Sequence, residues 1–149
     1  MDLYEKMKQD LITAMKEKDK ERLTVLRMVK GAMQLEHINN KKEEDENLLI
    51  DVVSKQIKMR KDSILEFEKG GRQDLIDKTN SEIEILNEYL PKQLSNEEVE
   101  EIINKVFEEE KPTSQKDMGI IMKTVTPLLK GKTDMKLVSE KIKERMGNL

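Results

Sequence analysis

The sequence predicts an all-α protein, on three observations. Apolar residues recur close to the 3.6-residue period of an α-helix almost everywhere along the 149 residues, and no stretch shows the period of two that marks a strand. Ala, Glu, Lys, Leu and Arg make up 67 residues, near the share of about half that is typical of long helices. The chain has 3 Pro and 6 Gly, too few for the many turns of an all-β protein.

Four helices are predicted in the first part of the chain. The first covers roughly residues 2–17, and the second follows Asp19, whose side chain is a good N-cap. The acidic run at residues 43–46 opens a long third helix, because carboxylates complement the positive end of the helix dipole. Gly70-Gly71 closes that helix, as glycine commonly does at a C-terminus. The fourth helix continues up to Pro91, which stops it.

Three more helices are predicted in the rest of the chain. Ser95 and Glu98 have the spacing of a capping box, in which each side chain bonds the backbone N–H of the other residue, and this marks a firm helix start. The remaining boundaries are Pro112, a second and weaker capping box at residues 114–117, a break at Gly131, and a cap at Thr133 or Asp134. We therefore expect a four-helix domain at residues 1–90, a hinge at 91–94, and a small three-helix domain at 95–149.

Composition excludes several classes of protein. The chain has no cysteine, which removes disulfides, thiolate metal ligands and cysteine nucleophiles. Its uninterrupted apolar runs are too short to span a bilayer, so no membrane partner is expected. The N-terminus lacks the basic and apolar regions of a secretory signal, and we expect a cytoplasmic protein. With a net charge of -3, any contact with nucleic acid requires a local basic patch.

The chain is poor in catalytic residue types. His37 is the one histidine, so a catalytic triad or a histidine-ligated metal site lacks partners, and an ordinary surface or partly buried role is favoured. Gly131-Lys132-Thr133 resembles the end of a phosphate-binding P-loop, but Thr126 stands where that motif needs its first glycine and a helix precedes it. We expect no catalytic residues, no metal and no cofactor.

A local concentration of lysines is the more informative feature. Residues 95–111 carry a charge of -5 (seven acidic and two basic side chains), whereas residues 112–149 carry +4 (eight basic and four acidic). Several lysines cluster at the turn between the last two helices, where ammonium groups and backbone N–H groups can face one phosphate backbone. We call Lys123, Lys130, Gly131, Lys132 and Lys136 the basic elbow, and Lys116 completes the predicted set of RNA-binding residues. The alternative is a solvated lysine-rich face.

Two arginines lie near apolar helix faces. Arg60 continues the stripe of Leu49, Val53 and Ile57, and a buried guanidinium needs a carboxylate partner or a helix edge. We expect a bridge to a residue such as Glu82 or Glu88. Arg27 in the second helix is a similar but weaker case.

With these residues in view, the chain resembles the YqeY-like family, which is related to the C-terminal region of the B subunit of glutamyl/aspartyl-tRNA amidotransferases. The resemblance rests on segments 26–30, 60–64, 72–75, 89–94, 116–119 and 130–132, which contain Arg27, Arg60, Arg72 and Pro91, expected as interdomain or structural residues. Two positions depart from the family pattern: Thr79 replaces a commonly acidic residue, and Thr133-Asp134-Met135 follows Gly-Lys where Ala, Asp and then Gly or Pro are usual.

The resemblance implies an all-helical fold in two parts. In the amidotransferase the corresponding tail contacts the tRNA elbow, and the chemistry belongs to a separate domain that this sequence lacks. The first hypothesis is therefore a non-catalytic module that binds tRNA or structured RNA through the basic elbow. The alternatives are a protein-interaction module that uses the groove between the two helical parts, and an accessory of carbon–nitrogen ligase activity with glutamine as amide donor.

Overall fold

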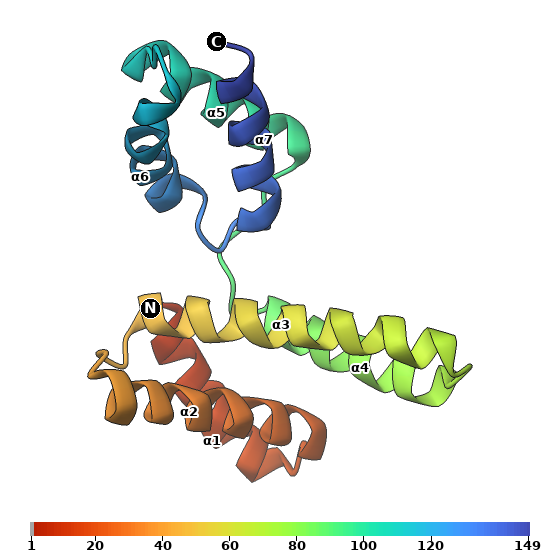
Figure 1. Ribbon diagram of the computed structural model, residues 1–149. Coiled ribbons are helices and arrows are strands. Elements are labelled where there is room, and N and C mark those ends of the chain that lie inside the picture. Colours follow the sequence, from red (N-terminus) through yellow and green to blue (C-terminus); the bar gives the residue numbers. More distant parts are fainter. Residues whose placement is uncertain (1) are drawn as a thin grey trace. The chain divides into compact units, whose positions relative to one another are not determined.

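The computed structural model describes residues 2–149 and confirms the all-α prediction (Figure 1). Within those residues there are seven α-helices, one short 3-10 helix and no strand. The chain divides into two compact units, with the boundary between Leu90 and Pro91. The helices of the first unit are α1 (Leu3–Glu17), α2 (Lys20–Asn40), α3 (Glu46–Lys69) and α4 (Gln73–Asn87). Those of the second are α5 (Asn96–Glu110), η1 (Gln115–Asp117), α6 (Met118–Leu129) and α7 (Met135–Gly147).

Side-chain caps set most helix starts, as the sequence predicts. The Asp19 carboxylate accepts a hydrogen bond from the backbone N–H of Arg22 at the start of α2. At the third helix Asp45 accepts the Leu48 N–H, so α3 begins at Glu46, the last residue of the acidic run. Each cap satisfies one of the N–H groups that a helix start leaves without a partner.

Two predicted boundaries are wrong. Helix α4 ends at Asn87, and the chain then turns tightly, with the N–H of Tyr89 bonded to the carbonyl of Leu86. Pro91 therefore follows a finished helix instead of stopping one. Ser114 makes no side-chain cap, because the N–H of Asp117 bonds the Ser114 carbonyl at 3.0 Å in a 3-10 turn. The Asp117 carboxylate accepts the backbone N–H of Thr113 at 2.9 Å.

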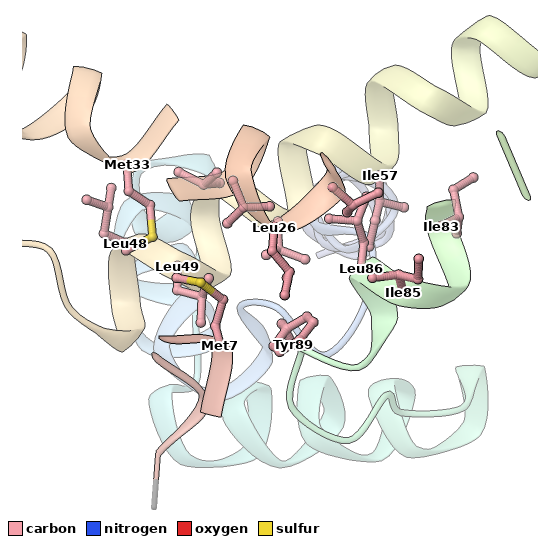
Figure 2. Packing of buried hydrophobic residues seen from close by; sticks show 14 residues of the cluster. Met7, Leu26, Met33, Leu48, Leu49, Ile57, Ile83, Ile85, Leu86 and Tyr89 are labelled. Carbon is pink, nitrogen blue, oxygen red and sulfur yellow. The ribbon is translucent and has the colours of Figure 1, made fainter. Parts of the chain in front are cut away.

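The core of the first unit is drawn from all four of its helices (Figure 2). Met33 of α2 lies beside Leu48 and Leu49 of α3, and Ile57 lies near Leu86 (Figure 2). Helices α3 and α4 lie along one another over much of their length (Figure 1). Burial of these aliphatic side chains, at about 25 cal/mol per Å² of apolar surface, is the main force that holds the four helices together.

Tyr89 lies in this core with a polar network at its hydroxyl. The side chain is fully buried, and its hydroxyl donates a hydrogen bond of 2.6 Å to Asp10 of α1. Arg22 of α2 donates to the same oxygen at 3.2 Å and bonds the Glu88 carboxylate at 2.7 Å. Burial raises the pKa of Tyr89, and the bond to Asp10 raises it further. The network ties the segment after α4 to both α1 and α2.

The stability of the first unit should fall in alkali because of Tyr89. The phenol has an ordinary pKa near 10.0 when unfolded and a higher pKa when folded, so the unfolded chain releases the proton first and the free energy of unfolding decreases as pH rises past 10.0. Below that pH the contribution of Tyr89 to the free energy of unfolding is fully present.

Tyr89→Phe should cost about 1–2 kcal/mol near neutral pH, since Asp10 loses its donor. Urea unfolding from pH 7 to 11 measures this, and an equal alkaline decrease in the variant would contradict it.

The second unit has its own core and its own caps. Ser95 and Glu98 form the predicted capping box at the start of α5. The three α-helices bury one apolar cluster, which consists of Val99, Ile103, Val106, Phe107, Ile121, Val125, Leu129, Val138, Ile142 and Met146. Helix α6 packs against both α5 and α7, and this packing fixes the turn between the last two helices.

Candidate nucleic-acid interface

The turn between α6 and α7 is built by local backbone geometry. Gly131 has φ of +77°, a left-handed conformation that glycine adopts without steric cost. The N–H of Lys132 then bonds the carbonyl of Leu129 at 2.9 Å and closes the turn. Asp134 caps α7 by accepting the N–H of Lys136 at 3.0 Å, so Asp134 rather than Thr133 fills the predicted cap.

The turn is also held by the segment before α5, residues 91–94, which the sequence predicts to be a hinge. The Gln93 side-chain amide donates to the carbonyl of Gly131 at 2.6 Å. The N–H of Leu94 bonds the carbonyl of Lys132 at 2.9 Å. Both carbonyls of the turn therefore have donors from residues nearly forty positions earlier in the chain. No local sequence pattern predicts these two contacts.

Most lysines of the basic elbow lie at the surface. Lys123, Lys130 and Lys136 are exposed, and Lys132 is half-buried. In the part of the chain that the structure describes, Lys123, Lys132 and Lys136 have no ion-pair partner. The nearest carboxylate along the chain, Asp134, accepts the backbone N–H of Lys136 as the cap of α7. Three ammonium groups of the elbow are thus without a paired carboxylate on or near a turn held by hydrogen bonds.

The basic residues farther along α7 are engaged instead with α5. Lys141 pairs with Glu100 at 3.1 Å, and the Arg145 guanidinium lies 4.3 Å from the centre of the Phe107 ring and bonds Asn104. These side chains line an open groove formed by Glu100, Ile103, Asn104, Lys141, Glu144 and Arg145. Two of the three basic side chains of α7 beyond Lys136 therefore contact α5, and one of them, Lys141, is paired with a carboxylate there.

Lys116 lies apart from the turn between α6 and α7. It is exposed in η1, before the first residue of α6, whereas Lys130, Gly131 and Lys132 follow the last residue. The 12 residues of α6 give a separation of about 18 Å along the axis, and Lys123 lies within α6 between the two ends. At the same end of α6 as Lys116, hydrogen bonding from the Thr113 backbone lowers the pKa of Asp117, so this carboxylate stays ionised. The structure brings Lys130, Gly131, Lys132 and Lys136 to one turn, but not Lys116 or Lys123.

Arg60 is buried in the first unit and has the predicted type of partner. Its Nε lies 3.4 Å from the Glu82 carboxylate of α4, while Glu88 pairs with Arg22 instead. The Nη1 group donates to the Gln56 side chain at 2.7 Å, and Nη2 contacts the Met28 sulfur at 3.6 Å. The Nε–H itself makes no hydrogen bond among residues 2–149. The guanidinium therefore joins α2, α3 and α4.

The other singled-out residues have local roles. Arg27 is exposed, with its guanidinium 3.8 Å from the Met15 sulfur. Arg72 is exposed and pairs with Asp74 at 3.1 Å, which lowers the pKa of that carboxyl. Pro91 is half-buried at the boundary of the two units. His37 is exposed, with Nδ1 2.8 Å from the Lys42 carbonyl.

Residues 2–149 contain neither a candidate metal site nor a candidate membrane-spanning helix. No group of three or more His, Cys, Asp or Glu side chains is placed to hold a metal ion there. None of the described helices combines the length and the apolar character that crossing a bilayer requires.

Comparison with known proteins identifies relatives along most of the chain. A family model described as Yqey-like protein matches residues 4–146. A protein of Kluyveromyces lactis, named altered inheritance of mitochondria protein 41, mitochondrial, is 46% identical over 84 residues, covering 56% of this chain and 45% of that protein. The protein of the same name in Lachancea thermotolerans is 42% identical over 60% of this chain and 49% of its own length. This chain thus spans about half the length of these relatives.

These names correct the predicted location. The relatives are called mitochondrial, so the cytoplasmic prediction is wrong on this comparison. It rested on the lack of a secretory signal. The lack of a secretory signal argues only against secretion. It does not distinguish a protein of the cytoplasm from a protein of an organelle.

One relative aligns along nearly the whole chain. The protein of the same name in Pyrenophora tritici-repentis is 31% identical over 95% of this chain and 80% of its own length. The match therefore includes both helical units and the turn between α6 and α7. Together with the family model, which covers all seven α-helices, it shows that the chain belongs to the YqeY-like protein family.

Proposed function

We propose that this helical module of the YqeY-like family binds tRNA or structured RNA through the basic elbow, without catalysing a reaction itself. The observation that carries the proposal is the contrast within the second unit. Lys141 and Arg145 are engaged with α5, whereas Lys123, Lys132 and Lys136 have no carboxylate partner among the described residues.

The elbow suits a phosphate backbone better than bases. Lysine ammonium groups displace counterions from phosphates, and that release supplies affinity independent of sequence. Base stacking needs exposed aromatic rings, and the single aromatic residue of the second unit, Phe107, is buried beneath Arg145. Recognition should therefore depend on the shape of the RNA and on the positions of its phosphates.

Two further features support the proposal. Gln93 and Leu94 hold the turn by hydrogen bonds, so less conformational freedom is lost when the lysines meet their phosphates. The segment 130–132 resembles the tail of the amidotransferase B subunit, which contacts tRNA. Lys116, at the other end of α6, would reach a second phosphate group about 18 Å from the elbow.

A titration of the full chain with a tRNA transcript tests the proposal. Binding should weaken as salt increases, by about 0.7–0.9 log units of affinity per log unit of salt for each lysine engaged. A folded RNA of unrelated sequence should bind within a few fold of the tRNA, while a single-stranded oligonucleotide should bind more weakly. No binding at low salt, or binding that does not respond to salt, would contradict the proposal.

A further inference from the structure

Helix α2 carries a second apolar stripe on the face that does not meet the core. Its core face consists of Val25, Leu26, Val29 and Met33, all of them buried. Outside that face lie Met28, Leu35 and Ile38, which are 46%, 60% and 71% exposed; Met28 lies at its edge, where its sulfur also contacts Arg60 of α3. Isolated exposed apolar residues are ordinary, but here three large ones share one helix face.

The spacing of this stripe is that of a coiled-coil seam. Thr24, Met28, Gly31, Leu35 and Ile38 follow one another at steps of four, three, four and three residues, which is the a and d pattern of a heptad repeat. The stripe extends over 15 residues, or about 21 Å of helix axis from its first residue to its last. Gly31 lies at its middle, and no heavy atom would lie within 4 Å of a Cβ at that position, so a second helix can approach closely there.

One edge of the stripe is basic. Lys20 and Arg27 are spaced seven residues apart at the position beside the seam, and the uncharged Gln34 follows at the same spacing. Both basic residues are exposed, and neither has an ion pair among residues 2–149. The Arg27 guanidinium rests on the Met15 sulfur of α1, a residue that is itself 49% exposed. Residues at such positions select the partner of a coiled-coil helix through their charge.

A second copy of the chain does not supply carboxylates to the basic side chains of this edge. In an antiparallel pair this edge faces the same edge of the other copy, which carries Lys20, Arg27 and Gln34 and no carboxylate. In a parallel pair it faces Ala32 and Asn39, which carry no charge. Neither arrangement supplies a carboxylate, whereas a helix with Asp or Glu beside its apolar seam supplies one at each turn.

From this complementarity we infer that the outer face of α2 docks an amphipathic helix of a partner protein, with an apolar seam of about four turns and acidic residues along its edge. Met28, Leu35 and Ile38 supply the apolar contact, and methionine adapts readily to a partner's shape. Lys20 and Arg27 set the preference for acidic partners. The inference concerns the first unit and is independent of RNA binding by the elbow in the second.

A pair of synthetic helical peptides tests the inference on the full chain. Both peptides have leucine at every a and d position over three heptads. One has Glu at the e and g positions and the other has Lys, so each repels itself and associates only with a partner of opposite charge. Fluorescence anisotropy should show binding of the Glu peptide at least tenfold tighter than of the Lys peptide. Equal affinities, or no binding of the Glu peptide, would overturn the inference.

Three variants locate the binding. Leu35→Glu, at a 60% exposed position, should abolish binding, while the matched control Leu65→Glu, at a 57% exposed position on α3, should leave it unchanged. Lys20→Glu with Arg27→Glu should reverse the preference toward the Lys peptide. Circular dichroism verifies that each variant folds.

Three results would reject the inference. One is peptide binding that survives Leu35→Glu. Another is a chain that sediments as a dimer and becomes monomeric with Leu35→Glu, which would assign the face to a second copy. The third is a loss of tRNA affinity in Lys20→Glu with Arg27→Glu and no binding of either peptide, which would assign the edge to nucleic acid.

Discussion

Reversing the charge of two elbow residues, Lys130→Glu with Lys132→Glu, should weaken tRNA binding about 30-fold or more near 0.1 M salt. Two lost phosphate contacts remove a counterion-release contribution of about 25- to 60-fold at that salt concentration. Two new carboxylates add repulsion from the same phosphates. Lys130 is exposed and Lys132 is half-buried, and neither belongs to the buried apolar cluster of the unit, so the fold should be retained. Filter binding measures the change.

A matched double reversal on the other unit separates position from net charge. Lys58 and Lys61 are exposed on α3, and Lys58→Glu with Lys61→Glu changes the net charge by the same amount. This control should bind tRNA within about twofold of the unmodified chain, since screening confines a surface charge to about 10 Å. An equal loss in both double variants would show that binding follows net charge, and the elbow would have no special role.

Removing the Glu82 carboxylate should destabilise the first unit by about 2–3 kcal/mol. Breaking a fully buried ion pair by removing one partner costs about 3–5 kcal/mol. Arg60 is 9% exposed and lies 3.4 Å from that carboxylate. In Glu82→Ala its charge stays buried, with Gln56 as the remaining polar contact. Urea unfolding followed by circular dichroism measures the loss.

Two comparisons test the reason for that loss. Lys69 and Glu66 are also 3.4 Å apart, but their side chains are 75% and 73% exposed, so Glu66→Ala should cost less than about 0.5 kcal/mol. Replacing the buried pair by apolar residues, Arg60→Met with Glu82→Leu, should restore the stability to within about 1 kcal/mol of the unmodified chain. A double variant less stable than Glu82→Ala would show that the pair itself is stabilising.

Much of the fold was predictable because helix ends are encoded locally. Asp19 caps its own helix within three residues, and the Ser95 box uses a partner three residues on. Gly71 adopts a φ of +66° at the end of α3, as a glycine in that place suggests. The box at Ser114 failed because the N–H of Asp117 bonds the Ser114 carbonyl instead of its hydroxyl, while the Asp117 carboxylate accepts the N–H of Thr113. Sequence spacing alone does not rank competing acceptors.

The features that depend on tertiary contacts were less predictable. Residues 91–94 read as a hinge in the sequence, yet Gln93 bonds a carbonyl 38 residues away, and no local pattern encodes such a contact. The network from Tyr89 to Asp10 spans 79 residues and was likewise missed. The outer stripe of α2 did have a signal, the 3.5-residue spacing of Met28, Leu35 and Ile38, which the stronger core stripe obscured.

The salt dependence of tRNA affinity, compared between the unmodified chain and Lys130→Glu with Lys132→Glu, tests the central claim most directly. The slope of log affinity against log salt counts the phosphate contacts that each protein makes. If the elbow supplies those contacts, the slope should decrease in magnitude by about 1.4–1.8 in the variant, that is, by about 0.7–0.9 for each lysine removed. An unchanged slope and affinity would show that RNA is not held at the turn between α6 and α7, and would contradict the proposed function.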